Sequence, residues 1–469
     1  MMGSDTSGRS SQPPESGYSR EDIRRALWQI TLAWIFGAPF FSLVGGAAFT
    51  SFLTKYLKAS DLVYGLVMAA GPAAMIFLFF GSYAAEHSGR AKRNMVVFVM
   101  AHRAIWIIVA AIPLYMTGLS QGTRLAIVGL VAFVSQALAN YGGGGWYAWI
   151  AEIVPQRIAG RFFGVRAKLA MLSMGLVSTS SVYLLQKHSG QGWVYALIFG
   201  IAALLGSTDL MIISTVRETR RAVEPQPPTL GDVMIMPWRN IAFRRFVLYT
   251  ASASIAYTMM GPFAWRFCFE PVRDHGLGMS VLPAHLLLFI LPTAAMAWSS
   301  PFWGRAIDRY GPKPVLAASA LSAVMIPTIW VWAHHDIVWA AWMASLLTGL
   351  TWPGIDQVNT WMMIKGFPDV RRTTYTATFQ FVVGLATVVG TALGGVCASL
   401  SSSLLGHAGP GWMSHYQPMF LLTIVLRLAA FMLFMPRLEL GGEARFAAVA
   451  RTIAADMRES LPVRIKKGH

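Results

Sequence analysis

The chain has 469 residues, of which 55% are hydrophobic and only 13% carry a charge, and its mean hydropathy is +0.51. A typical soluble protein is roughly 45–50% apolar and about 25% charged, so the composition argues against a soluble fold. The formal net charge of +17 would indicate a nucleic-acid partner in a soluble protein, but in a membrane protein the distribution of charge has to be read first. Two cysteines, Cys268 and Cys397, provide neither a disulfide framework nor a metal-ligand cluster.

Taken in order, the chain opens with a polar tail that lacks the apolar core and cleavage site of a signal peptide. Twelve apolar runs follow, and each reaches the ~20 helical residues that a bilayer core requires. Six precede a charged, proline-rich segment, at residues 28–54, 61–81, 95–116, 124–151, 166–187 and 193–215. Six come after it, at residues 246–269, 281–303, 314–334, 337–363, 374–400 and 417–436.

These runs predict an all-α integral membrane protein with twelve transmembrane helices in two six-helix bundles. The expected parts are a tail at 1–27, an N-terminal bundle at 28–216, a linker at 217–243, a C-terminal bundle at 244–437 and a tail at 438–469. In the last tail, Phe446, Val449, Ile453 and Met457 share one face of a basic amphipathic helix, which we expect to lie along the inner leaflet.

Lysine and arginine collect at one end of the runs. If the N-terminus is cytoplasmic, 30 of the 38 basic residues lie on that side, five lie on the other side and three lie within runs. The five are Lys55, Lys58, Arg124, Lys187 and Arg273. The positive-inside rule therefore predicts that both termini are cytoplasmic. The same asymmetry accounts for the net charge, so we expect no nucleic-acid partner.

A short motif occurs twice at the cytoplasmic ends of the runs. Each copy has a small residue, a carboxylate four positions later, a glycine three after that, and then a lysine. The copies are Ser82–Arg93, which contains Glu86 and Gly89, and Gly304–Lys313, which contains Asp308 and Gly311. The carboxylates are 222 residues apart, about half the chain, which indicates an internal duplication.

The paired motif resembles the loop between the second and third helices of the major facilitator superfamily, with its repeat between helices eight and nine. The resemblance covers nearly the whole chain. The first copy departs from the family pattern at Ser82, Glu86 and His87, and the second has Pro312 where a basic residue is expected. The resemblance implies two pseudo-symmetric bundles, transport by alternating access, and a cytoplasmic latch that joins the halves when the outside is open.

A second segment fits such a latch, at the end of the fourth run and the start of the fifth. Charged groups at an occluded helix end are costly unless they are paired. We therefore expect a network of Glu86, Arg90, Glu152 and Arg161, although solvated loop charges are the alternative. The gate candidates are Glu86, Gly89, Arg90, Glu152, Arg161, Asp308, Arg309 and Gly311.

Ionisable residues within apolar runs are expensive and often functional. Arg103 lies near mid-membrane in the third run, where structural pairing and ligand binding are equal alternatives. Asp356 lies about one turn beyond Trp352-Pro353-Gly354, where the proline favours a kink, and we prefer a functional role for it. Arg266 and Glu270 are four residues apart and are expected to form a local ion pair.

In the family that the chain resembles, helices one, four, seven and ten line a central cavity. The candidates for this cavity are Asn140, Tyr141, Tyr257, Trp352, Asp356 and Arg103. An aromatic, weakly polar cavity suits a moderately apolar organic solute, while ordinary packing is the alternative. The four glycines of 142–145 cost roughly 1 kcal/mol each in a helix and predict either close helix packing or a bend.

The sequence contains no apparent nucleotide-binding motif and no apparent catalytic Ser, His and Asp arrangement, so we expect neither an ATP-driven pump nor an enzyme, and no cofactor. We predict a monomeric secondary transporter of the plasma (inner) membrane, whose partners are a small organic solute and the lipid bilayer. Proton coupling and the direction of transport stay open. The alternative is a non-transporting sensor or assembly scaffold of the same fold, for which the basic C-terminal tail is the hint.

Overall fold

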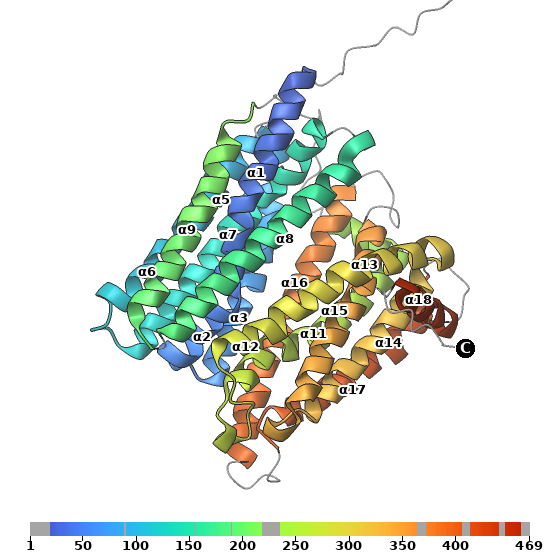
Figure 1. The fold of residues 1–469 in the computed structure, drawn as a ribbon. Helices are drawn as coiled ribbons and strands as arrows, with labels where there is room; N and C mark the ends of the chain where they lie inside the picture. Colours follow the sequence, from blue (N-terminus) through green and yellow to red (C-terminus); the bar gives the residue numbers. More distant parts are fainter. Residues whose placement is uncertain are drawn as a thin grey trace, which may run out of the picture.

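The computed structural model describes residues 19–88, 91–154, 156–188, 190–217, 235–363, 372–405, 413–439 and 446–460. Every regular element within these residues is helical. Figure 1 shows two helical bundles side by side, one formed by the N-terminal half of the chain and one by the C-terminal half.

The N-terminal half runs from α1 to α9. Its elements are α1 (Arg20–Gly45), α2 (Ala47–Ser51), η1 (Phe52–Tyr56), α3 (Asp61–Ala73), η2 (Ala74–Ile76), α4 (Phe77–Ser88), α5 (Ala91–Ala104), α6 (Trp106–Tyr115), α7 (Gln121–Ile153), α8 (Gln156–Lys187) and α9 (Gly192–Ser214).

The C-terminal half runs from η3 to α18. Its elements are η3 (Met236–Arg239), α11 (Ile241–Phe269), η4 (Val272–Asp274), α12 (Val281–His285), η5 (Leu286–Ile290), α13 (Leu291–Tyr310), α14 (Pro312–Val331), η6 (His335–Ile337), α15 (Val338–Trp361), α16 (Arg372–Leu405), α17 (Gln417–Phe434), η8 (Met435–Arg437) and α18 (Phe446–Ser460).

Ten helical segments of the described chain are long and apolar enough to cross a membrane. The two other long helices of the bundles are α11 and α15, which carry more polar side chains. The last third of α15, for example, contains Asp356, Gln357 and Asn359. With these two, the described chain has twelve long helical segments, six in each half, and the predicted fold class is confirmed.

Small polar residues set where several helices begin. Ser19 and Asp22 form a capping box, so α1 begins at Arg20, inside the segment predicted to be a tail. Ser60 and Ser120 accept hydrogen bonds from the first-turn backbone of α3 and α7. Asn240 does the same for α11, which therefore begins within the predicted linker; most of that linker lies outside the described residues.

Several of the described membrane segments are interrupted rather than straight. The first bends at Gly46 and continues through the π-helical turn η1. The second changes to the 3₁₀ turn η2 at Ala74, two residues after Pro72. The eighth passes through the π-helical turn η5, and such turns occur often at functional sites.

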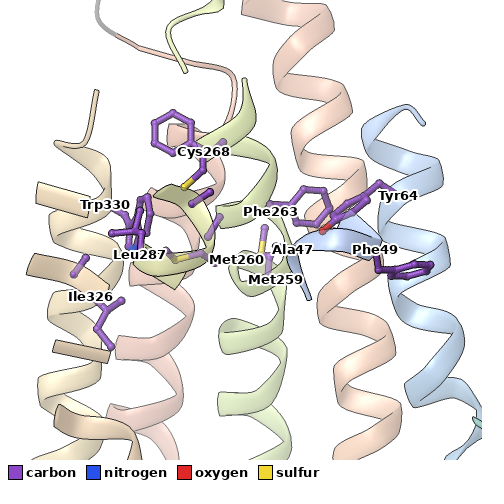
Figure 2. Close-up of a cluster of buried hydrophobic side chains, with 14 of the residues drawn as sticks. Ala47, Phe49, Tyr64, Met259, Met260, Phe263, Cys268, Leu287, Ile326 and Trp330 are labelled. Atoms are coloured by element: carbon purple, nitrogen blue, oxygen red, sulfur yellow. The ribbon is translucent and has the colours of Figure 1, made fainter. Parts of the chain in front are cut away.

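The helix ends define two faces of the molecule. We call the face at the start of α1, which also carries α18, the basic face, and the opposite face the far face. A continuous apolar cluster joins the halves toward the far face, and Figure 2 shows Phe49 and Tyr64 of the N-terminal half beside Phe263 of the C-terminal half. A separate cluster around Ile30 and Trp149 fills the N-terminal half near the basic face. The halves therefore share an apolar core toward the far face.

The C-terminal helix α18 packs against α13 and α14. Val449 is fully buried there, and the hydroxyl groups of Tyr310 and Thr452 are 2.8 Å apart. The amphipathic helix was expected to place its apolar face in the inner leaflet. Instead, two of the residues on that face, Val449 and Ile453, are buried within the protein itself.

Candidate functional site

An ionic cluster joins the two halves at the far face. The Arg266 Nε atom lies 2.8 Å from Asp61 Oδ1, and its NH1 group donates to the Ala59 carbonyl at 2.7 Å. The Tyr416 hydroxyl donates to the same carboxylate at 2.9 Å, and His415 Nε2 lies 3.3 Å from Asp61 Oδ2. Asp61 and Ala59 belong to the N-terminal half and the other three to the C-terminal half, so each contact must break for the halves to separate here.

This arrangement corrects the predicted pair of Arg266 and Glu270. Helix α11 ends at Phe269, and the Glu270 backbone has left the helical conformation, so the spacing of four no longer brings the two side chains together along a helix. The carboxylate that pairs with Arg266 is Asp61 from the other half. Burial raises the pKa of the Glu270 carboxyl, which lies just beyond the helix.

Glycines allow helices α3 and α16 to approach closely across the halves. A Cβ atom at Gly65 would lie 3.1 Å from both the Gly395 Cα and the Thr391 carbonyl oxygen. Small residues let helix backbones meet in this way in membrane proteins. Next to this contact, the Tyr64 hydroxyl donates to the Pro262 carbonyl of α11 at 2.9 Å.

The third contact between the halves is made by α8 and α12. The Gln186 side-chain oxygen accepts a hydrogen bond from the Leu282 backbone at 3.0 Å. His285 Nε2 lies 3.3 Å from the Ser178 hydroxyl and 3.4 Å from the Thr179 hydroxyl. We call these three contacts together the far-face seam. Its residues are Ala59, Asp61, Tyr64, Gly65, Ser178, Thr179, Gln186, Pro262, Arg266, Leu282, His285, Thr391, Gly395, His415 and Tyr416.

Two cavity candidates lie together in the C-terminal half, and a third lies on the same helix as one of them. The rings of Tyr257 on α11 and Trp352 on α15 meet edge to face at 5.2 Å. Behind them, the Arg427 guanidinium lies 4.8 Å from the Tyr257 ring centre and donates to the Ala323 carbonyl. Asp356 lies about one turn from Trp352 toward the basic face, is exposed, and makes no ion pair with the described residues. The group offers aromatic surface next to one carboxylate.

The other cavity candidates do not join this group. Asn140 donates to the Ala74 carbonyl at 3.0 Å and so satisfies the broken turn after α3. The Tyr141 ring packs at 4.3 Å from that of Phe98 on α5. Both side chains bind neighbouring helices of the N-terminal half.

Arg103 forms a buried ion pair within the N-terminal half. Its NH2 atom lies 3.5 Å from Asp209 Oδ2, and both side chains are almost completely buried. The guanidinium also stacks between Phe40 and Phe41, at 4.1 and 4.4 Å from the ring centres. Gly206 leaves room for the arginine stem, because a Cβ there would lie 2.7 Å from Arg103 Cδ. The geometry matches the structural pairing alternative for Arg103.

The lysines of the duplicated motif have equivalent contacts. Lys92 Nζ donates to the Ser214 carbonyl at 2.7 Å, at the end of α9, and Lys313 Nζ donates to the Leu438 carbonyl at 2.7 Å, just past α17 and η8. Each lysine thus binds free carbonyls at the end of the last membrane helix of its own half, where a positive charge is favourable. Gly311 has a φ of +82°, a conformation that favours glycine at the turn between α13 and α14.

Most of the predicted gate cannot be placed. Gly89, Arg90 and the side chains of Glu86, Glu152 and Arg161 lie outside what the structure describes. Asp308 is exposed, and the Arg309 guanidinium lies 5.2 Å from the ring centre of Tyr310 in its own half. The latch stays a prediction.

The glycine run does not break its helix. Helix α7 is continuous from Gln121 to Ile153. A Cβ at Gly142 would lie 2.7 Å from the Val99 side chain and 3.3 Å from the Met95 carbonyl oxygen. At Gly142 the structure therefore shows close packing with α5.

Most of the seam residues were not anticipated from the sequence, and Arg266 was anticipated with Glu270 rather than Asp61 as its partner. Asp61 follows Ser60 at the start of a run, where an acidic residue is ordinary, and His285 lies inside an apolar run without a charged neighbour. A usable signal did exist for the ionic cluster. The predicted topology puts three charged or titratable residues at the non-cytoplasmic ends of their runs: Asp61, Arg266 and His415. They were therefore possible partners of one another.

Comparisons with known proteins place this geometry in context. Residues 271–447 match the sequence model of a family described as Major Facilitator Superfamily. No curated protein sequence matches the chain. Among solved structures, a mutant of the nucleoside transporter NupG is similar over 88% of this chain and 99% of its own, with 13% identity and a TM-score of 0.65.

Two further structures show the same fold. A bacterial homologue of the human lysosomal transporter Spinster, in an inward-facing and unoccupied conformation, is similar over 94% of this chain and 99% of its own, with 15% identity and a TM-score of 0.64. The D-xylose-proton symporter is similar over 89% of this chain and 99% of its own, with 14% identity and a TM-score of 0.63.

Proposed function

We propose that the chain is a member of the major facilitator superfamily and that it moves a small organic solute across its membrane by alternating access. Fold and family support secondary transport rather than catalysis. The protein is an integral membrane protein, and we further propose that it acts as a monomer in the plasma membrane with both termini in the cytoplasm.

The observation that carries the proposal is the closure of the two halves at the far face. The ionic cluster around Asp61, the Gly65–Gly395 contact and the His285 contact all join the halves toward the far face. In Figure 1 the two bundles meet near α2, α3 and α12, and α16 runs alongside the N-terminal half. A carrier that exposes a central site to each side in turn requires such a closure at the side that is shut.

The distribution of basic residues supports the sidedness of this state. Positive residues favour the cytoplasm, so the basic face is the cytoplasmic one. A carrier that is closed at the far face is then inward-facing. The closed far face alone carries this argument, because most of the predicted gate side chains at the basic face are not described.

The solute site that we propose is the group of Tyr257, Trp352 and Asp356. Their helices, α11 and α15, are the seventh and tenth membrane segments, which line the central cavity in the family. Two aromatic rings and one exposed carboxylate suit a moderately apolar organic solute that offers a hydrogen-bond donor or a positive charge. The carboxylate is also the residue that we propose as a proton carrier, since burial by a bound solute would favour its neutral form.

The scaffold alternative is not favoured. The basic C-terminal tail suggested this alternative. The structure shows α18 of that tail packed on α13 and α14, with Val449 and Ile453 buried. Two of the apolar side chains that a partner would have used, Val449 and Ile453, are therefore already buried.

The test begins with a thermal-shift screen of purified protein against a metabolite library, followed by uptake of the stabilising compounds into proteoliposomes. Asp356→Asn should abolish accumulation driven by a proton gradient and leave solute exchange intact. Asp274→Asn is the matched control, because Asp274 is a far-face carboxylate whose ion pair with Arg273 stays within one half. Absence of flux for every compound that stabilises the protein would contradict transport, and unchanged pH dependence in Asp356→Asn would remove only the proton role.

A further inference from the structure

His285 occupies an unusual place in the far-face seam. It is the last residue of α12, is 2% exposed, and contacts Ser178 and Thr179 of the opposite half through Nε2. Its other ring nitrogen, Nδ1, is buried and has no hydrogen-bond partner among the described residues. The ring stacks on Phe289 at 5.1 Å, within the π-helical turn η5 that directly follows.

The closed seam offers this histidine no compensating charge. The elements that pack against α12 are α2, α8, α11 and η5, and none of them contains an aspartate or a glutamate. Among their titratable groups, Tyr183 and Lys187 are exposed and Cys268 is a buried thiol. Arg266 is bound to Asp61, and the Arg427 guanidinium lies 4.8 Å from the ring centre of Tyr257. A protonated imidazole would thus be a buried cation without a partner, which is strongly unfavourable.

Opening of the far face removes the energetic cost of protonating His285. The hydroxyl groups of Ser178 and Thr179 would leave with the other half, and water would reach the ring from outside. An imidazole in water titrates near pH 6.5 and so accepts a proton in the physiological range. From these contacts we propose that His285 is a proton-binding site of the carrier, occupied when the far face is open and empty when it is closed.

Proton binding and opening are then thermodynamically linked, so acid on the far side favours the open state. The proposal rests on the alternating access of the proposed function. The His285 site is distinct from Asp356. In the closed state described here Asp356 is exposed and His285 is buried.

Protonation of the second histidine of the seam, His415, should favour the closed state instead. His415 lies 3.3 Å from the Asp61 carboxylate, so a proton on its ring strengthens an ion pair that exists only in the closed state. Acid should therefore act on the two histidines with opposite signs. This contrast allows the contribution of His285 to be isolated in a His415→Gln background.

The experiment measures the open fraction directly, without solute, by the distance between spin labels on the two halves. Labels attach at Thr117→Cys and Asp336→Cys, two exposed far-face positions, in a chain whose Cys268 and Cys397 are replaced by alanine. If only the open state binds the proton, lowering the pH from about 7.5 to about 5.5 raises the open-to-closed ratio of the His415→Gln protein roughly tenfold. His285→Gln, which keeps a polar side chain next to Ser178, should remove this rise.

His335→Gln is the control, since His335 is an exposed histidine of the far face and should leave the pH response unchanged. A ratio that does not depend on pH in the His415→Gln protein, or one that responds equally after His285→Gln, overturns the proposal. If His285→Gln does not insert, His285→Asn takes its place. The double variant Ser178→Ala, Thr179→Val provides a further check, because it weakens closure while keeping the tenfold response, and loss of that response would also count against His285. These distances require no transported compound, so failure to find a solute and failure of the proton site are separate results.

Discussion

Asp61→Asn tests whether the ionic cluster holds the far face closed. The substitution keeps the size of the side chain and removes its charge. In the closed state Asp61 accepts from Arg266 at 2.8 Å and from Tyr416 at 2.9 Å, and the side chains of Asp61 and Arg266 are only 11% and 13% exposed. In the open state the two halves are apart, so the substitution changes the energy of the closed state alone.

The expected magnitude follows from these contacts. A hydrogen bond to a charged group contributes about 1.5–3 kcal/mol, and an arginine left without its carboxylate in a poorly hydrated site adds a further penalty. The asparagine oxygen still accepts one bond, which offsets part of this loss. A net change of about 3 kcal/mol corresponds to roughly a hundredfold fall in the closed-to-open ratio.

The label pair at Thr117 and Asp336 measures this ratio at neutral pH. Asp274→Asn is again the matched control, because its ion pair with Arg273 does not cross between the halves. Equal distance distributions for Asp61→Asn and the parent, in protein that is folded and inserted, would show that the cluster does not stabilise closure. The apolar and glycine contacts of the seam would then have to account for it.

Four other tests give distinct outcomes. Gly65→Val places atoms within about 3 Å of the α16 backbone, so we expect overpacking of about 1–3 kcal/mol and a larger open fraction by the same label pair. Val449→Asp should release α18 from α13 and α14, at a loss of about 1.5–3 kcal/mol of packing, seen as faster proteolysis of the tail. If the predicted latch forms, Asp308→Asn should shift the carrier toward the far-face-closed state and slow transport; equal labelling of cytoplasmic cysteines in the variant and its parent would contradict this. A reporter fused after Arg220 should be cytoplasmic and one near Lys187 should not, and both reporters in one compartment would contradict the topology.

The fold was predictable because its signals are local. Runs of apolar residues of membrane length, and a motif repeated at half the chain length, need no knowledge of contacts between helices. Boundaries were less accurate where a cap decides them. The capping box of Ser19 and Asp22 starts α1 within the expected tail, and Asn240 starts α11 within the expected linker.

The site was predictable in part, for a physical reason. Depth along a helix follows from residue number, and Tyr257 and Trp352, which were both expected near mid-membrane, do have rings in contact. Rotation about the helix axis does not follow from residue number in a helix that is apolar on all sides, so Asn140 was placed in the cavity although it binds the Ala74 carbonyl. Contacts between the halves depend on the conformational state as well, and Asp61 with Arg266 is such a contact.

The paired lysines at the basic face bear on how the two halves can move relative to each other. Lys92 binds the end of α9, and Lys313 binds the chain just past α17, so each half closes off its last helix with a residue of its own. None of these bonds has to be broken and remade when the halves rock. Each bundle can therefore rotate as a rigid body, and the contacts that change between the two states are confined to the interface between the bundles.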